Sequence, residues 1–115
     1  MDERIEKWLV DIKQSISEIE QYFEGHEKNF HAYRQNMILK RAIERNLEII
    51  GEAVNRILQR DISYESKIRS AKGIVGLRNQ IIHAYDSISD ENIWAILINH
   101  LPKLSEDINR LLAEK

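Results

Sequence analysis

The sequence contains no cysteine, a single proline and only four glycines. The absence of cysteine excludes disulfide cross-links, thiolate zinc sites and cysteine nucleophiles. All-β domains reverse the chain often and use glycine and proline to do so, so a chain this poor in both is expected to form long helices. Long hydrophobic runs are also lacking, because the longest, residues 93–98, is far too short to cross a bilayer.

The length and composition predict one domain that covers residues 1–115. Hydrophobic residues make up 43% and charged residues 31% of the chain, which is typical of a soluble globular protein and excludes a disordered tail. The opening residues MDERIEKW carry charge where a signal peptide needs an apolar core. We therefore expect a cytoplasmic protein.

The charge is unevenly distributed along the chain. The net charge of −2 gives the whole molecule no electrostatic attraction for nucleic acid. Residues 56–78, however, carry a net charge of +4, from Arg56, Arg60, Lys67, Arg69, Lys72 and Arg78 against Asp61 and Glu65. From charge alone, this segment fits a phosphate-binding patch and an ordinary solvated surface equally well.

Apolar residues recur every three or four positions in several segments, which is the pattern of amphipathic helices. The first such segment predicts a helix of about five turns that Gly25 ends, and Asn29 is a candidate cap for the next helix. Residues 30–60 contain no proline or clustered glycine and predict one uninterrupted helix. Residues 61–70 lose the pattern and predict a connection with one helical turn.

The second half of the chain predicts two further helices. The helical pattern resumes over Ala71–His83. Ser89 is a good cap for the last helix, in which the apolar phase continues unchanged on both sides of Pro102, so we expect a kink there and not a new element. These segments together predict an all-α fold, an up-and-down antiparallel four-helix bundle.

The helix expected over residues 30–60 has an unusually wide apolar arc. Beside its main stripe lies a second stripe made of Ile38, Ala42, Ile49 and Ala53. An arc this wide predicts that the helix packs against its own bundle and against a second copy of the chain, and the alternative is a central helix in a monomer. Asn46 and Glu52 lie between or beside the stripes, where they would line a cleft or bond to one another.

The four histidines are not expected to form a metal site. His26 and His31 are five residues apart, whereas two zinc ligands on one helical turn are four apart, and no third ligand accompanies them. His100, just before the kink expected at Leu101–Pro102, is expected to be a structural or surface residue. We expect neither a metal ion nor a cofactor.

Residues 76–85, GLRNQIIHAY, combine a permanent cation, a carboxamide, an imidazole and a phenol in Arg78, Asn79, His83 and Tyr85. If this segment is helical, Asn79 and His83 share one polar face, but Arg78 projects about 140° away from His83. Either the helix breaks before His83, or the arginine side chain curls round, or two protomers combine their residues. The alternative is that the arginine and the histidine are unrelated surface residues.

The pattern Arg78-x4-His83-x-Tyr85, with Asn79 directly after the arginine, resembles the R-x4-H-x-Y signature of the HepT-like branch of the HEPN superfamily. Its members are the toxin halves of HepT–MntA toxin–antitoxin pairs. Residues 41–53, RAIERNLEIIGEA, look like the second helix of that family, and Ile93 and Trp94 after the acidic SDEN turn also fit. The resemblance spans essentially the whole chain.

The resemblance implies a helical homodimer whose two motifs face one cleft and act as a metal-independent endoribonuclease. RNA supplies its own nucleophile in the 2′-OH, so two copies of His83 would serve as base and acid while Arg78 neutralises the phosphorane and Asn79 positions the phosphate or the imidazole. Lys72 and Arg69 are the candidate contacts to the RNA backbone. Losing His83 should nearly silence cleavage.

The resemblance also implies a partner. In related pairs an MntA-like nucleotidyltransferase antitoxin transfers AMP to the tyrosine of the motif, which here is Tyr85. The added bulk and negative charge would compete with RNA for Arg78. Two other readings stay open: a non-catalytic helical adaptor that binds such a nucleotidyltransferase, which the acidic net charge favours slightly, and a plain dimeric scaffold.

Overall fold

The structure, a computed structural model, describes residues 1–25, 28–83 and 89–115, with only the backbone of residues 82 and 83. Within this part of the chain all regular structure is helical, which confirms the predicted fold class. The elements are α1 (Glu3–Tyr22), α2 (Phe30–Gln35), α3 (Met37–Arg60), the 3-10 turn η1 (Ile62–Glu65), α4 (Ala71–His83), α5 (Asp90–Ala95), the π-helical turn η2 (Ile96–His100) and α6 (Leu101–Ala113).

Two helices begin at the polar capping residues that the sequence predicts. The Asn29 side chain accepts a hydrogen bond from the backbone N–H of Ala32 at 3.0 Å, and the Ser89 hydroxyl accepts one from Asn92 at 3.1 Å. Gly25, just after α1, has a positive φ of 73°, a conformation that glycine adopts without strain. The expected caps of α2 and α5 are therefore confirmed.

The prediction of one unbroken helix over residues 30–60 is wrong at Asn36. This residue has an extended backbone, with φ −106° and ψ 94°, and its side chain accepts a hydrogen bond from the Leu39 N–H at 3.0 Å. Asparagine competes for backbone groups in this way and so begins a new helix, α3. Apolar spacing alone does not reveal the break, because the residues on both sides keep a helical pattern.

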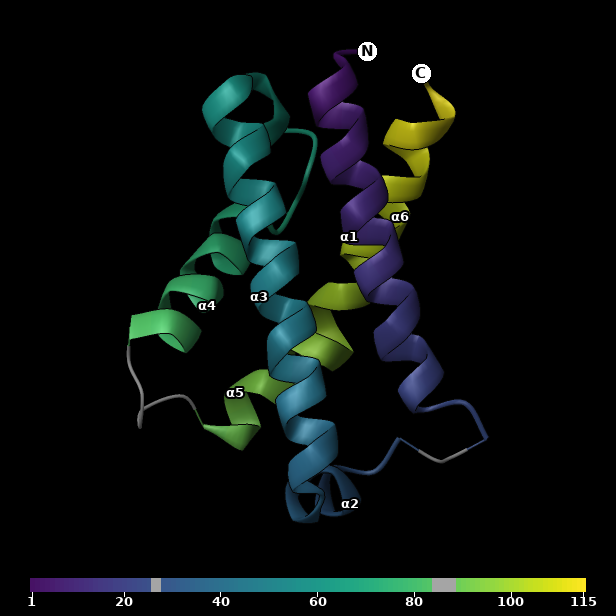
Figure 1. The fold of residues 1–115 in the computed structure, drawn as a ribbon, viewed down its shortest axis with the longest axis vertical. Helices are drawn as coiled ribbons and strands as arrows, with labels where there is room; N and C mark the ends of the chain where they lie inside the picture. The colour runs from purple at the N-terminus through teal and green to yellow at the C-terminus, as the bar shows by residue number, and fades with distance from the viewer. Residues whose placement is uncertain (26–27, 84–88) are drawn as a thin grey trace.

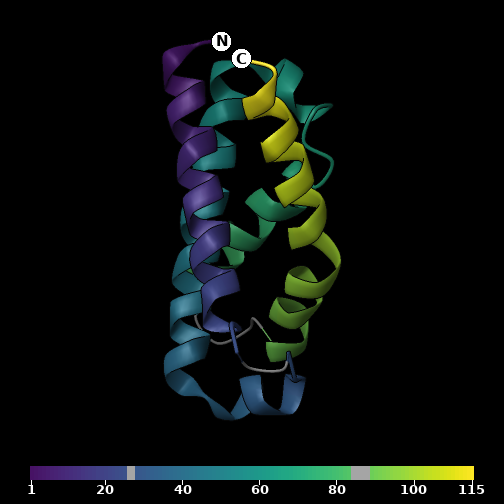
Figure 2. The same cartoon turned by 90° about the vertical axis from the view of Figure 1, so that its right-hand side faces the viewer.

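The last helical stretch continues through Pro102, as expected. Residues 90–113 are helical throughout, but the hydrogen-bond pattern widens into a π-helical turn over Ile96–His100, immediately before the proline. Proline lacks an N–H and its ring crowds the preceding turn, so the regular α-helical hydrogen bonds are interrupted there. The π-helical turn lies at this interruption. Figure 2 shows the resulting bend between α5 and α6.

Helices α1 and α3 lie side by side and antiparallel, and they carry much of the core between them (Figure 1). Helix α6 packs beside α1, and α4 crosses the other side of α3. The core is aliphatic, and its wholly buried members include Leu9, Ile12, Ile43, Leu47, Ile50, Ile57, Ile74 and Leu104. The described helices include none that is long and apolar enough to span a membrane. The four-helix bundle arrangement and the dimer stay predictions.

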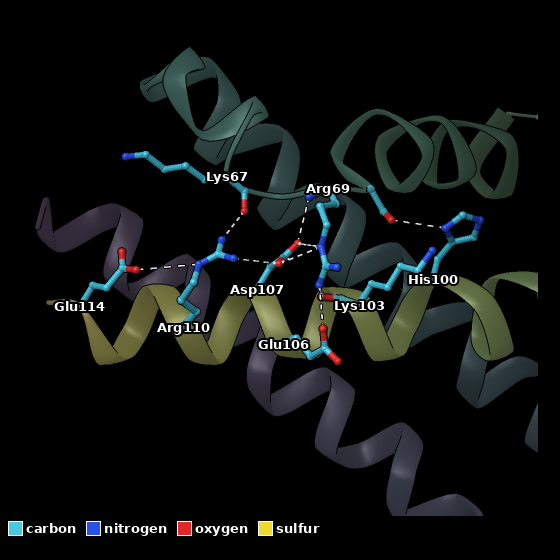
Figure 3. A network of polar contacts seen from close by, with 9 residues as sticks. Lys67, Arg69, His100, Lys103, Glu106, Asp107, Arg110 and Glu114 are labelled. Carbon is cyan, nitrogen blue, oxygen red and sulfur yellow. Dashed lines mark hydrogen bonds and ion pairs between the residues drawn. The ribbon is translucent and has the colours of Figure 1, made fainter.

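A buried carboxylate fixes the connection that leads into α4 (Figure 3). Asp107 on α6 is fully buried and accepts hydrogen bonds from the backbone N–H of Arg69 at 2.9 Å and from the Arg69 Nε at 3.1 Å. Arg110 adds an ion pair to the same carboxylate at 3.2 Å. Burial alone would raise the pKa of Asp107, but these hydrogen bonds and the two positive charges lower it below its ordinary value. The start of α4 is thereby tied to α6.

Candidate functional site

Helix α4 carries the arginine–histidine motif without a break. It runs from Ala71 to His83, so the helix does not end before the histidine. Five residues along one α-helix separate Arg78 from His83 by about 140° around the axis. The side chain of His83 and the whole of Tyr85 lie outside the described residues. One of the three expected ways of joining Arg78 and His83, a helix break, is therefore excluded.

Arg78 is a partly buried cation that two neighbours hold. Its Nη2 atom lies 2.5 Å from Oε2 of Glu52 on α3, and its Nη1 donates a hydrogen bond to Oδ1 of Asn79 at 2.9 Å. The contact with Glu52 is an ion pair by distance, although Oε2 accepts no hydrogen bond of ordinary geometry. Within the described part of the chain, the buried Nε of Arg78 has no hydrogen-bond partner. Arg78 is thus held in place while one of its hydrogen-bond donors stays unpaired among the residues described.

Gly51 explains how α4 comes close enough for this contact. A Cβ atom on Gly51 would lie 2.3 Å from Cβ of Arg78 and 3.1 Å from the carbonyl oxygen of Ile74. Real side chains do not pack at such distances, so α3 accepts α4 here because residue 51 has no side chain. The next residue, Glu52, is then in position to meet the guanidinium.

A cavity of about 340 Å³ adjoins Arg78 between α1, α3 and α4. Its lining is three arginines, three carboxylates and an apolar remainder: Arg45, Arg56, Arg78, Asp11, Glu48, Glu52, Trp8, Ile49 and Ala53. Glu52 also accepts a hydrogen bond from Arg56 Nε at 3.0 Å. One carboxylate therefore lies between two guanidinium groups, so these three side chains keep an excess of one positive charge, while the lining as a whole is balanced.

The two polar residues of α3 have separate partners. Asn46 is buried, and its Nδ2 donates to the Tyr22 hydroxyl at 3.0 Å and to the Ala42 carbonyl at 3.2 Å. Glu52 instead pairs with arginines and lines the cavity. Asn46 therefore has a structural role, and Glu52 lines a cavity within one chain, while its place in a cleft between two protomers stays a prediction.

The two candidate RNA contacts differ in how they are engaged. Lys72 has a side chain that is 81% exposed and forms an ion pair with Glu65 at 3.1 Å. Arg69 bonds to Asp107 and also pairs with Glu106 at 2.8 Å. The pKa of Arg69 is raised by its hydrogen bonds to Glu106 and Asp107. Arg69 is thus part of the structural cluster at α6, and Lys72 is the more accessible cation.

The second apolar stripe of α3 is only partly covered. Ile38 is 83% exposed, Ala42 and Ile49 are half-buried, and Ala53 is buried. Ile49 and Ala53 also line the cavity that holds Arg78. This partly covered stripe therefore runs into the cavity that Arg78 lines.

The pairing of Glu52 with Arg78 is not apparent from the sequence. The two residues are 26 positions apart, and no short motif joins them. A glycine inside a long helix, followed at once by a carboxylate, was the available signal, since such a glycine often marks a close approach of another backbone. The contribution of Trp8 from α1 to the same cavity had no signal in the sequence.

Comparison with known proteins gives consistent matches. Residues 12–111 match the family model described as ribonuclease HepT-like. "Putative RNase TTE0752" of Caldanaerobacter subterraneus subsp. tengcongensis is 31% identical over 76% of this chain and 77% of its own length. "Putative RNase MJ0127" of Methanocaldococcus jannaschii is 28% identical over 96% of this chain and 88% of its own. No solved structure matches the chain significantly.

Proposed function

This chain belongs to the ribonuclease HepT-like family, and we propose that it is an endoribonuclease that cuts RNA without a metal ion at a cleft shared by two copies of the chain. The observation that carries the proposal is the placement of Arg78. Its side chain lines a cavity, its guanidinium is anchored by Glu52 and Asn79, and its Nε is buried without a hydrogen-bond partner among the described residues. An arginine prepared in this way suits a phosphodiester.

The proposed reaction needs only groups that the motif supplies. The 2′-oxygen of a ribose attacks the adjacent phosphorus while one His83 imidazole takes its proton. Arg78 stabilises the dianionic phosphorane, and Asn79 holds the phosphate or the imidazole. The bond to the 5′-oxygen then breaks as a second imidazole donates a proton to it, which leaves a cyclic phosphate on one product and a 5′-hydroxyl on the other.

The second imidazole would come from the partner protomer. The separation of Arg78 and His83 around α4 supports this, because one copy of the helix does not present both groups in the same direction. The stripe that contains Ile38 and Ile49 is only partly covered and continues into the cavity, so it is the proposed dimer face. Lys72 is the better-placed candidate for holding the RNA backbone, while Arg69 would have to do so beside Asp107 and Glu106.

We further propose that the protein is the toxin of a cytoplasmic toxin–antitoxin module. An MntA-like nucleotidyltransferase would neutralise it by adenylylating Tyr85. AMP at that position would place a phosphate next to the motif, where it competes with RNA for Arg78.

The central test is RNA cleavage in EDTA. The parent protein should cut RNA, Arg78→Ala should lower the rate about 10²- to 10³-fold, and His83→Ala should lower it about 10²- to 10⁴-fold. Arg41→Ala on α3 and His31→Ala on α2 remove the same residue types from exposed positions and should cleave like the parent. Circular dichroism and mass by light scattering check that fold and dimer persist.

Two results would redirect the assignment. If Arg78→Ala and His83→Ala cleave like the parent, these are not the catalytic residues. If the parent does not cut RNA in EDTA but binds a nucleotidyltransferase, the non-catalytic adaptor is correct, a role that the acidic net charge of −2 favours.

The role of Tyr85 has a test of its own. Tyr85→Phe should keep nuclease activity and acquire no AMP when incubated with the cognate nucleotidyltransferase and ATP, because the acceptor oxygen is gone. Intact-mass spectrometry measures the adduct. The same adduct on Tyr85→Phe as on the parent would place the modification elsewhere.

A further inference from the structure

We propose that Glu52 is a positioning residue for RNA cleavage, which acts by holding the Arg78 guanidinium in its working orientation before RNA binds. This inference rests on the proposed function, since it assigns Glu52 to the same site. It concerns a residue on a different helix, outside the arginine–histidine motif.

The contacts that support the role come from two helices. Glu52 on α3 and Arg78 on α4 meet at 2.5 Å, with side chains that are 34% and 23% exposed. Gly51 is what allows the helices to approach at this point, since any Cβ there would overlap Cβ of Arg78. The glycine leaves space for the Arg78 side chain, and the glutamate orients its guanidinium group.

Orientation matters because arginine is long and has several rotatable bonds. A guanidinium that is free to move would lose conformational entropy when the phosphorane forms, and this loss would raise the activation free energy. A guanidinium that is already fixed avoids that loss and needs no reorganisation during the reaction. Asn79 fixes Nη1 and Glu52 fixes Nη2, so the head group is held from two sides.

A carboxylate beside a phosphate-binding arginine also carries a cost, because it repels the anion. Here that repulsion is offset by Arg56, whose Nε donates to the other oxygen of Glu52 at 3.0 Å. Two guanidinium groups share one carboxylate, so these three side chains keep an excess of one positive charge, although the whole lining holds as many arginines as carboxylates. Glu52 can therefore orient Arg78 without cancelling the charge of both arginines.

The test compares Glu52→Gln with Glu44→Gln. Glu44 is also on α3 and also pairs with an arginine, Arg41, at 3.0 Å, but it does not line the cavity. Glu52→Gln should lower kcat about 10- to 100-fold, with KM changed less than about 3-fold, because the interaction serves the transition state more than the ground state. Glu44→Gln should match the parent. Glu52→Asp, which keeps the charge on a shorter chain, should recover part of the loss.

A second measurement does not depend on catalysis. The ¹⁵Nε–Hε NMR signal of Arg78, assigned through Arg78→Lys, should shift and exchange faster with water in Glu52→Gln, and should not change in Glu44→Gln. If the parent shows no cleavage, this signal still decides whether Glu52 fixes Arg78, so failure of the proposed function and failure of this inference are distinguishable.

Several outcomes would overturn the inference. An unchanged kcat in Glu52→Gln would mean that Arg78 needs no holding. Loss of one limb of the pH–rate profile would make Glu52 a proton-transfer group instead, since a positioning residue leaves the profile's shape intact. A raised KM with unchanged kcat would make it a ground-state contact, and an unchanged Arg78 signal would mean that the pair does not persist in solution.

Discussion

Two clusters of arginines and carboxylates differ in how completely their polar groups are used. The Asp107 cluster consists of Asp107, Arg69, Arg110 and Glu106, and the Arg78 cluster consists of Arg78, Glu52, Asn79 and Arg56. In the Asp107 cluster both carboxylate oxygens accept hydrogen bonds, and the spare arginine donors reach backbone carbonyls, at 3.3 Å on Lys103 and 2.7 Å on Lys67 (Figure 3). In the Arg78 cluster a buried guanidinium nitrogen has no hydrogen-bond partner among the described residues, and Arg78 and Glu52 line a cavity.

The difference separates a structural role from a functional one. A buried charge is tolerated when its hydrogen-bonding capacity is satisfied, and the Asp107 cluster meets this condition. A site that must accept a ligand keeps some capacity unused, at a cost in stability. We therefore expect mutations in the Asp107 cluster to affect mainly folding, and mutations in the Arg78 cluster to affect mainly activity.

The largest expected effect on stability is that of Asp107→Asn. It removes a buried charge and turns one acceptor into a donor that faces two guanidinium groups, which should lower the free energy of unfolding by about 2–3 kcal/mol. The equivalent change in the other cluster, Glu52→Gln, should cost about 1 kcal/mol or less, because its surroundings open into a cavity. Urea denaturation measures both. Equal losses would contradict the distinction between the two clusters.

Gly51→Ala tests the close approach of α3 and α4. The new methyl group would overlap Cβ of Arg78, so α4 must shift, with a loss of about 1–2 kcal/mol and a displaced guanidinium. Gly73→Ala on α4 is the matched control, because nothing lies within 4 Å of its Cβ position, and alanine there should stabilise the helix by up to about 1 kcal/mol. Thermal unfolding distinguishes them, and a neutral Gly51→Ala would show that α4 moves away at no cost.

Acid should weaken the Asp107 cluster. The pKa of Asp107 is lowered in the folded protein, so its contribution to stability is fully present above the unfolded pKa of about 4 and is lost as pH falls through the folded pKa. Below about pH 4, the free energy of unfolding of the parent should therefore fall more steeply than that of Asp107→Asn. The extra loss should not exceed the difference in unfolding free energy between the two proteins at neutral pH. Parallel curves in pH-dependent urea unfolding would mean that the carboxylate is not stabilised by its arginines.

The smallest expected effect is that of Glu106→Gln. Glu106 pairs with Arg69 at 2.8 Å, as short as any contact in the Asp107 cluster apart from the bond to Lys67, but its side chain is 72% exposed. Exposed pairs are screened by water, so the change should cost less than about 0.5 kcal/mol in urea denaturation. A loss as large as that of Asp107→Asn would show that the number of contacts, and not burial, gives the cluster its strength.

Local signals in the sequence predicted the elements well. The caps at Asn29 and Ser89, the turn within residues 61–70 and the extent of α4 were all predictable, because each depends on a few consecutive residues. The break at Asn36 was missed because periodicity averages over a turn, whereas a cap acts through one side chain. Its pairing with the Leu39 N–H could have been suspected from residue type alone.

The sequence by itself determined the helical class, the helix caps and the arginine–histidine motif with its family, because periodicity, capping and a short motif are properties of neighbouring residues. Only the tertiary structure decided that Gly51 leaves room for Arg78 and that Glu52 pairs with it. The same holds for the hydrogen bonds from Asn46 to Tyr22 and from Arg69 to Asp107, which join different helices or segments. These pairings depend on how two helices cross. A crossing angle is set by the packing of many side chains at once, and no short stretch of residues encodes it.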